Sequence, residues 1–186
     1  MRIDMKTLLY LFVLMSFTVN AQNKHLTKTG VITFEASVPS FEEIAATNNS
    51  VTAIFDADTG KFAVLALVKG FRFKNALMEA HFNENYVASD LYPKAKFKGT
   101  IEGFSLENFD HIKSDYEING TLEFHGKVKQ IESCLIRITN LDTNGLHMIG
   151  SLEVKTSDYS IEIPKIVRKK VSDIITINFE FNLIKT

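Results

Sequence analysis

Period-two alternation of apolar and polar residues constrains the fold of this chain more than any other feature. Between residues 32 and 38, apolar side chains at even positions alternate with Thr33, Glu35 and Ser37. Successive side chains of a strand point to opposite sides of a sheet, so this pattern predicts a strand with one buried face. The same alternation returns at residues 95–101, 116–124, 146–154 and 175–183.

Turn signals between such segments indicate that neighbouring strands are antiparallel. Asp58-Thr59-Gly60 and Asn144-Gly145 each separate two strand-like segments, and short turns of this composition join the strands of hairpins. Asn119-Gly120 is different, because it falls inside a continuous alternation. A glycine at such a position predicts a bend or a bulge within a strand.

The strand-like segments number about eight or nine, with one or two short helices among them. The chain lacks the repeated strand–helix order that builds parallel sheets, and its strand pattern runs nearly to the C-terminus. Closing such a sheet removes its exposed edges. The sequence therefore predicts an all-β fold, a single antiparallel eight-stranded β-barrel. A sandwich of two sheets is the alternative that this pattern leaves open.

Segment 62–68 breaks the alternation, because it is apolar on both faces. Its outer face needs a cover, which is either a second subunit or the helical-looking stretch 75–85. One stripe of that helix would be apolar and consists of Leu77, Met78, His81 and Phe82. A second short helix is predicted near Ser40, because Ser40 and Glu43 have the spacing of a capping box.

The N-terminus has the pattern of an export signal. Two basic residues precede the almost wholly apolar stretch 8–17, and small residues suited to cleavage end at Ala21. We expect residues 1–21 to be a signal peptide and residues 22–186 to be one domain in the periplasm or outside the cell. The apolar stretch is about half of the roughly 20 residues that span a bilayer, so stable membrane insertion is not expected.

The charge of the chain argues against nucleic acid as a partner. The formal net charge is -1, and the loss of two basic residues and one acidic residue with segment 1–21 changes it to -2. Binding to phosphates requires a concentrated basic surface. The one basic cluster is more typical of a solvated turn than of a lipid headgroup site; it consists of Lys165, Arg168, Lys169 and Lys170.

No arrangement of residues typical of an enzyme stands out. Cys134 is the only cysteine and lies in an apolar strand-like run, which predicts a buried, unreactive thiol. No His-x-x-x-His spacing and no Gly-x-Ser-x-Gly motif occurs. We therefore expect no catalytic residue, no metal and no cofactor, and we expect His81 and His125 to hydrogen-bond backbone groups. The enzymatic alternative is a metal-assisted hydrolase that uses His81, Glu84 and His125, and it requires these side chains to converge.

Six segments carry a family resemblance through their order and spacing. They are residues 29–34, 77–86, 89–90, 92–99, 120–126 and 157–159. Together they resemble the YceI-like family of secreted lipid-binding β-barrels, also called polyisoprenoid-binding proteins. The resemblance implies an extended, up-and-down, lipocalin-like barrel of eight antiparallel strands. Such a barrel holds a long isoprenoid or similar amphiphile in an apolar lumen.

Two segments differ from the family pattern. Many members have an Arg-Asp pair at the start of the helical segment and an Asn-Arg-Ser-Asp-Phe-Gly type motif late in the chain. Here residues 76–79 are Ala-Leu-Met-Glu, and residues 155–160 are Lys-Thr-Ser-Asp-Tyr-Ser. The resemblance therefore assigns no polar contact to the head of a ligand.

Lipid binding is the function that these observations favour. The exported barrel would store or carry a long-chain isoprenoid, a quinone-like molecule or a fatty amphiphile, driven by burial of apolar surface. The residues expected to line its lumen are Phe34, Phe62, Val64, Phe97, Leu122, Phe124, Ile177 and Phe179. The alternative is a structural or stress-related interaction protein, without a ligand, whose barrel is filled by its own side chains and which acts through its surface or as a homodimer.

Overall fold

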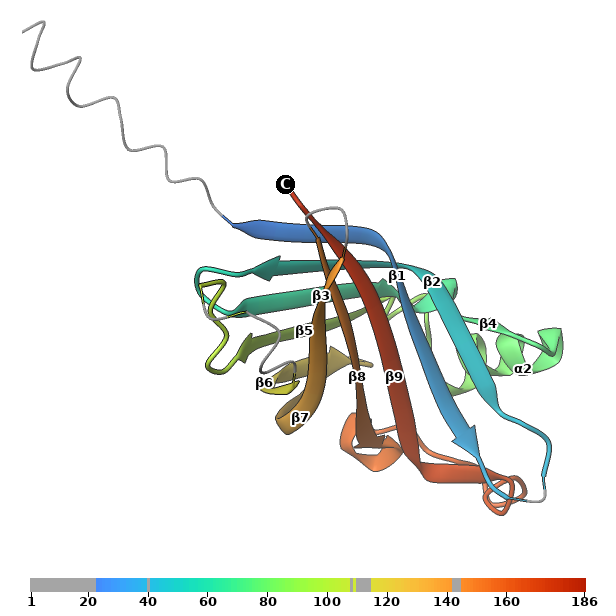
Figure 1. Ribbon diagram of the computed structural model, residues 1–186. Helices are drawn as coiled ribbons and strands as arrows, with labels where there is room; N and C mark the ends of the chain where they lie inside the picture. The colour runs from blue at the N-terminus through green and yellow to red at the C-terminus, as the bar shows by residue number, and fades with distance from the viewer. Residues whose placement is uncertain (1–22, 40, 108, 110–114, 142–144) are drawn as a thin grey trace, which may run out of the picture.

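The structure is a computed structural model that describes residues 23–39, 41–107, 109, 115–141 and 145–186. Strands dominate this part of the chain (Figure 1). Their bounds are β1 Lys24–Ser37, β2 Ala45–Asp56, β3 Lys61–Leu67, β4 Arg72–Phe73, β5 Lys94–Ile101, β6 Asp115–Phe124, β7 Lys127–Leu141, β8 Gly145–Lys155 and β9 Val171–Lys185. The helical elements are η1 Val68–Gly70, α2 Ala76–His81, η2 Phe82–Tyr86 and η3 Thr156–Tyr159. Within the described ranges, none of these helices has the length and apolar character needed to cross a membrane.

Eight of the described strands close into an up-and-down barrel. Each long strand pairs antiparallel with the next long strand along the chain, and β9 pairs back with β1. The two-residue β4 pairs with the beginning of β2. The prediction of an antiparallel eight-stranded barrel is confirmed, and the sandwich alternative is wrong. The predicted signal peptide, residues 1–21, lies outside the described residues.

The two ends of the barrel interior differ in packing. At the end that holds the β2–β3 turn, large apolar side chains fill the interior, and Phe55, Ile138 and Met148 are 0% exposed. At the other end, inward residues such as Phe34 and Ile177 are only half-buried. Figure 1 shows α2, the β1–β2 loop and the segment after η3 at this second end, away from the C-terminus. The barrel is therefore solid in one half and hollow in the other.

A bulge interrupts the pairing of β6 and β7 at Asn119-Gly120. The register of the two strands shifts immediately before Gly120, and Asn119 Oδ1 accepts a hydrogen bond of 2.7 Å from the amide of Ser133. Gly120 lies opposite Gly99 of β5, and a Cβ on Gly120 would lie 2.7 Å from Phe97 Cζ. The predicted bulge is confirmed, and the lack of a side chain on Gly120 leaves room for the Phe97 ring inside the barrel.

α2 does not cover the outer face of β3, so one of the two covers expected for this strand is wrong. Leu77 was expected on the apolar stripe of the helix but is 63% exposed, and Leu65 and Leu67 of β3 are 37% and 55% exposed. The helix lies instead over the hollow end of the barrel, where Met78 and Phe82 line the interior. A second subunit on β3 remains a prediction.

The described residues beside the predicted capping box do not form a helix. Residues 41–44 form an irregular loop, and Ser40 lies outside the described residues. The amide of Ala36 donates to the carbonyl of Ile44 at 2.8 Å, and the amide of Ile44 donates to Ser37 Oγ at 3.0 Å. The prediction of a helix here was wrong because these backbone groups are satisfied across the loop.

Candidate functional site

The hollow half of the barrel contains an apolar cavity of about 390 Å³. Inward-facing side chains of the strands form its wall, and α2, η2, η3 and the loop that follows η3 form its mouth. Its floor is the surface of the packed half and includes Phe62, Ile118, Cys134 and Phe181. Ligand pockets in proteins typically measure about 300–1,000 Å³ and are lined mainly by apolar side chains. The cavity has both properties.

The residues that the sequence predicted for the lumen all line this cavity. They come from β1, β3, β5, β6 and β9, and they are Phe34, Phe62, Val64, Phe97, Leu122, Phe124, Ile177 and Phe179. Alternation along each strand places them on the inner face. Their contact with a ligand remains a prediction.

Sequence reasoning missed two aromatic residues beside the mouth, Phe71 and Phe73. The ring centroid of Phe34 lies 5.3 Å from that of Phe71, 5.6 Å from that of Phe73 and 5.3 Å from that of Phe82. The loop after η3 adds three apolar side chains, Ile161, Ile163 and Val167. The apolar character of these three residues in an otherwise polar and basic segment is the sequence signal that could have identified them. The mouth therefore adds apolar surface to that of the wall.

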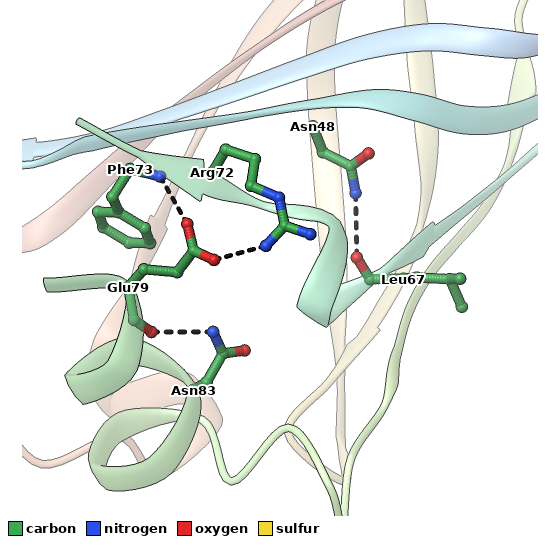
Figure 2. Close-up of polar contacts among 6 residues, drawn as sticks. All are labelled: Asn48, Leu67, Arg72, Phe73, Glu79 and Asn83. Atoms are coloured by element: carbon green, nitrogen blue, oxygen red, sulfur yellow. Dashed lines mark hydrogen bonds and ion pairs between the residues drawn. The ribbon is translucent and has the colours of Figure 1, made fainter. Parts of the chain in front are cut away.

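Polar contacts fasten α2 to β4 beside the mouth (Figure 2). The carboxylate of Glu79 accepts hydrogen bonds from the guanidinium of Arg72 and from the amide of Phe73 at 3.2 Å. The side-chain amide of Asn83 donates to the carbonyl of Glu79 at 2.8 Å. Glu79 therefore connects the helix to the strand that carries Phe73 of the aromatic cluster.

A buried asparagine fixes the turn that leads from β3 to β4. Asn48 is 0% exposed, and its Nδ2 donates to the carbonyl of Leu67 at 3.0 Å (Figure 2). Its Oδ1 accepts from the amide of Ser50 at 3.0 Å. A Cβ on Gly70 would lie 2.5 Å from Asn48 Nδ2. Only glycine fits at this point, so Asn48 and Gly70 together position β4 and the aromatic cluster.

Tyr159 is a buried phenol at the cavity. It is 1% exposed, and its ring packs edge-on against Phe124 with centroids 5.8 Å apart. His125 Nδ1 hydrogen-bonds the carbonyl oxygen of Tyr159 at 2.8 Å and so fixes its backbone. The hydroxyl of Tyr159 has no hydrogen-bond partner among the described residues. Burial raises the pKa of Tyr159 to about 12, with a smaller contribution from the carboxylate of Asp158, so the phenol stays protonated at neutral pH.

The few polar residues that line the cavity belong to its mouth. The lysines Lys155 and Lys170 both line it, together with His81, Thr156 and Tyr86. Among the described residues, no Asp or Glu side chain lines the cavity. The lining of the mouth, over the part of the chain that the structure describes, therefore carries basic side chains and no acidic ones.

A comparison with known protein families shows where this barrel belongs. The family model for the YceI-like domain matches residues 15–183. The chain belongs to the YceI-like family. A search of curated proteins gave no match.

Solved structures with low sequence identity share the YceI-like fold of this chain. A polyisoprenoid-binding domain from Saccharophagus degradans is similar with a TM-score of 0.73 and 13% identity, over 89% of this chain and 99% of that one. BcnA of Burkholderia cenocepacia has a TM-score of 0.67 and 16% identity, over 84% and 96%. A YceI protein of Campylobacter jejuni has a TM-score of 0.56 and 19% identity, over 72% and 78%.

The structure of this YceI-like chain offers no support for the hydrolase alternative. Among the described residues, no three His, Cys, Asp or Glu side chains lie close enough together to hold a metal ion. His125 instead bonds the backbone of Tyr159 and packs against the ring of Tyr92 with centroids 4.7 Å apart. This confirms the backbone role predicted for His125, whereas His81 is exposed at the mouth.

Cys134 has the properties of a structural thiol. It is 5% exposed, and its Sγ lies 3.4 Å from the carbonyl oxygen of Ser151. Burial raises the pKa of the thiol to about 11. Because the thiolate is the reactive species, the thiol is unreactive at neutral pH, as the sequence predicted.

Proposed function

We propose that this protein stores or carries a long-chain isoprenoid, a quinone-like molecule or a fatty amphiphile in the hollow half of its barrel. One observation carries this proposal: a single cavity wall collects all the lumen residues predicted from the sequence, and it is almost wholly apolar. Membership of the YceI-like family supports it, because a structural neighbour with the same fold is described as a polyisoprenoid-binding domain.

Burial of the hydrocarbon supplies the binding free energy in this proposal. Removing apolar surface from water contributes about 25 cal/mol per Å², or about 0.8 kcal/mol for each methylene-sized unit. A long chain can bind tightly without a specific polar contact, and the length and width of the lumen then determine selectivity. The filled half of the barrel fits the alternative of an interaction protein without a ligand. That alternative, however, gives the hollow half no function.

Native mass spectrometry of the protein purified without detergent tests the proposal. Solvent extraction and mass analysis should release one defined amphiphile at about one per chain. A bare protein that also fails to take up added long-chain prenyl lipids would reject the carrier function and leave the interaction protein. The same spectrum gives the oligomeric state, and the mass of the mature chain tests the expected cleavage after Ala21.

A matched pair of variants shows whether lipid enters the lumen. Val64 lines the cavity, whereas its neighbour Leu65 points outward from the same strand. Val64→Trp should fill the lumen and reduce the bound lipid, and Leu65→Trp should leave it unchanged. Equal lipid content in the two variants would place the lipid outside the barrel.

A further inference from the structure

The described charged side chains that line the mouth of the cavity are basic. Lys155 ends β8 and Lys170 precedes β9, and both line the cavity. Neither lysine forms an ion pair with another residue that the structure describes. Both side chains are exposed, so their ammonium groups reach the water at the mouth while the stems lie along the apolar wall.

Three acidic side chains near the mouth have cationic partners, whereas Glu84 and Glu162 are exposed to water. Glu79 pairs with Arg72, Glu43 pairs with Lys74, and Asp158 lies 3.8 Å from Lys129. None of these carboxylates lines the cavity. The charges of Lys155 and Lys170 are therefore not balanced within the described lining.

The Tyr159 hydroxyl is a further unsatisfied polar group of a residue that lines the cavity. It is a protonated donor and has no hydrogen-bond partner among the described residues. Buried polar groups in proteins are nearly always hydrogen-bonded. An oxygen acceptor in the head of a ligand would satisfy this donor, whether that oxygen is charged or neutral.

We propose that the cavity selects amphiphiles with an anionic oxygen head, a carboxylate or a phosphate, whose charge is balanced at the mouth by Lys155 and Lys170. This inference rests on the proposed function, because it assigns the head of the lipid whose chain fills the lumen. The chain supplies most of the affinity, and the two lysines supply the discrimination between heads. Each lysine would pair with the head near solvent. The contribution of these ion pairs to affinity therefore falls as salt screens the charges.

Binding of single-chain probes below their micelle concentrations tests the inference. The probes share one chain and differ in the head: dodecanoate, dodecyl phosphate, dodecanol and dodecylamine. Lys155→Met/Lys170→Met should weaken dodecanoate and dodecyl phosphate about three- to tenfold, with dodecanol unchanged. A larger loss for dodecyl phosphate identifies phosphate as the preferred head, and a larger loss for dodecanoate identifies carboxylate.

A second double variant provides the control for net charge. Lys28→Met/Lys61→Met removes the same charge from exposed lysines that do not line the cavity, and it should leave all four affinities unchanged. Equal losses in the two double variants, or equal affinities of wild type for dodecylamine and dodecanoate, overturn the inference. In that case dodecanol still binds and the proposed function stands. If none of the four probes binds, both proposals fail.

Discussion

The ring of Phe179 occupies the space above Gly150, its partner across β8 and β9. A Cβ on Gly150 would lie 2.3 Å from Phe179 Cζ. The ring of Phe181 likewise lies against Gly30, where a Cβ would lie 2.4 Å from Phe181 Cδ1. Inward-facing glycines thus let large rings lie flat against the barrel wall, so the lumen keeps its width.

Gly150→Ala should both destabilise the barrel and narrow its lumen. The added methyl group forces the Phe179 ring toward the cavity that it lines, and overpacking of this kind costs about 1–3 kcal/mol. Chemical denaturation measures the first effect, and the uptake of long-chain lipid measures the second. Ser151→Ala, at the exposed next position of β8, should change neither quantity. Wild-type stability and uptake in Gly150→Ala would show that the ring moves aside without strain.

His25 should make the stability of the protein depend on pH. Its side chain is 4% exposed, and burial lowers its pKa. The hydrogen bond to the carbonyl of Asn23 opposes this shift in the pKa only in part, and the smaller effect of Lys185 adds to it. The folded state therefore binds a proton less readily than the unfolded state, whose histidine pKa is about 6.5. The stabilisation that the neutral His25 contributes to the folded state is complete above the unfolded pKa of about 6.5. It is lost as the pH falls through the lower pKa of the folded state.

Comparison with His25→Gln isolates this contribution, because glutamine does not titrate. The free energy of unfolding of wild type minus that of His25→Gln should fall as the pH is lowered from about 8 to about 5. Denaturant titrations at several pH values measure this difference. A difference that is constant over the whole range would contradict the assignment.

Alternation predicted the barrel and the inner face of its strands, but it could not tell which half is hollow. Phe55 in the packed half and Phe34 in the cavity wall stand in similar apolar patterns, and their exposure depends on what the closed barrel places opposite them. The sequence also could not predict the position of α2, because the hydrogen bonds of Glu79 with Arg72 and Phe73 of β4 form only in the folded protein. The capping-box spacing at Ser40 led to the wrong prediction of a helix, because local spacing does not reveal hydrogen bonds across a loop.

Glu79→Ala should loosen α2 from the mouth of the cavity. The substitution removes the acceptor of both Arg72 and the Phe73 amide, and the lost hydrogen bonds amount to about 1–3 kcal/mol. Hydrogen exchange at the Phe73 amide should become faster, and bound lipid should dissociate faster. Glu84→Ala, on the exposed side of η2, serves as the control and should alter neither rate. Unchanged exchange at Phe73 in Glu79→Ala would mean that the helix is held by its apolar contacts alone.

Tyr159→Phe should leave the ligand-free protein as stable as wild type or make it more stable by about 1 kcal/mol. The unfolded state hydrates the hydroxyl, whereas the folded state buries it without a partner among the described residues, and an unsatisfied buried group costs about 1–3 kcal/mol. The ring contact with Phe124 and the hydrogen bond from His125 to the backbone carbonyl do not involve the hydroxyl, so both persist in the variant.

Tyr159→Ala provides the contrast, because it also removes the ring and should cost about 3–5 kcal/mol, as other large-to-small aromatic substitutions do. Denaturation of both variants, each freed of lipid by solvent extraction and refolding, measures the two effects separately. A Phe variant that is less stable than wild type would show that the hydroxyl gains a hydrogen bond in the folded protein, for example to an ordered water. The donor would then be satisfied before any ligand arrives, and it would no longer favour a head group with an acceptor oxygen.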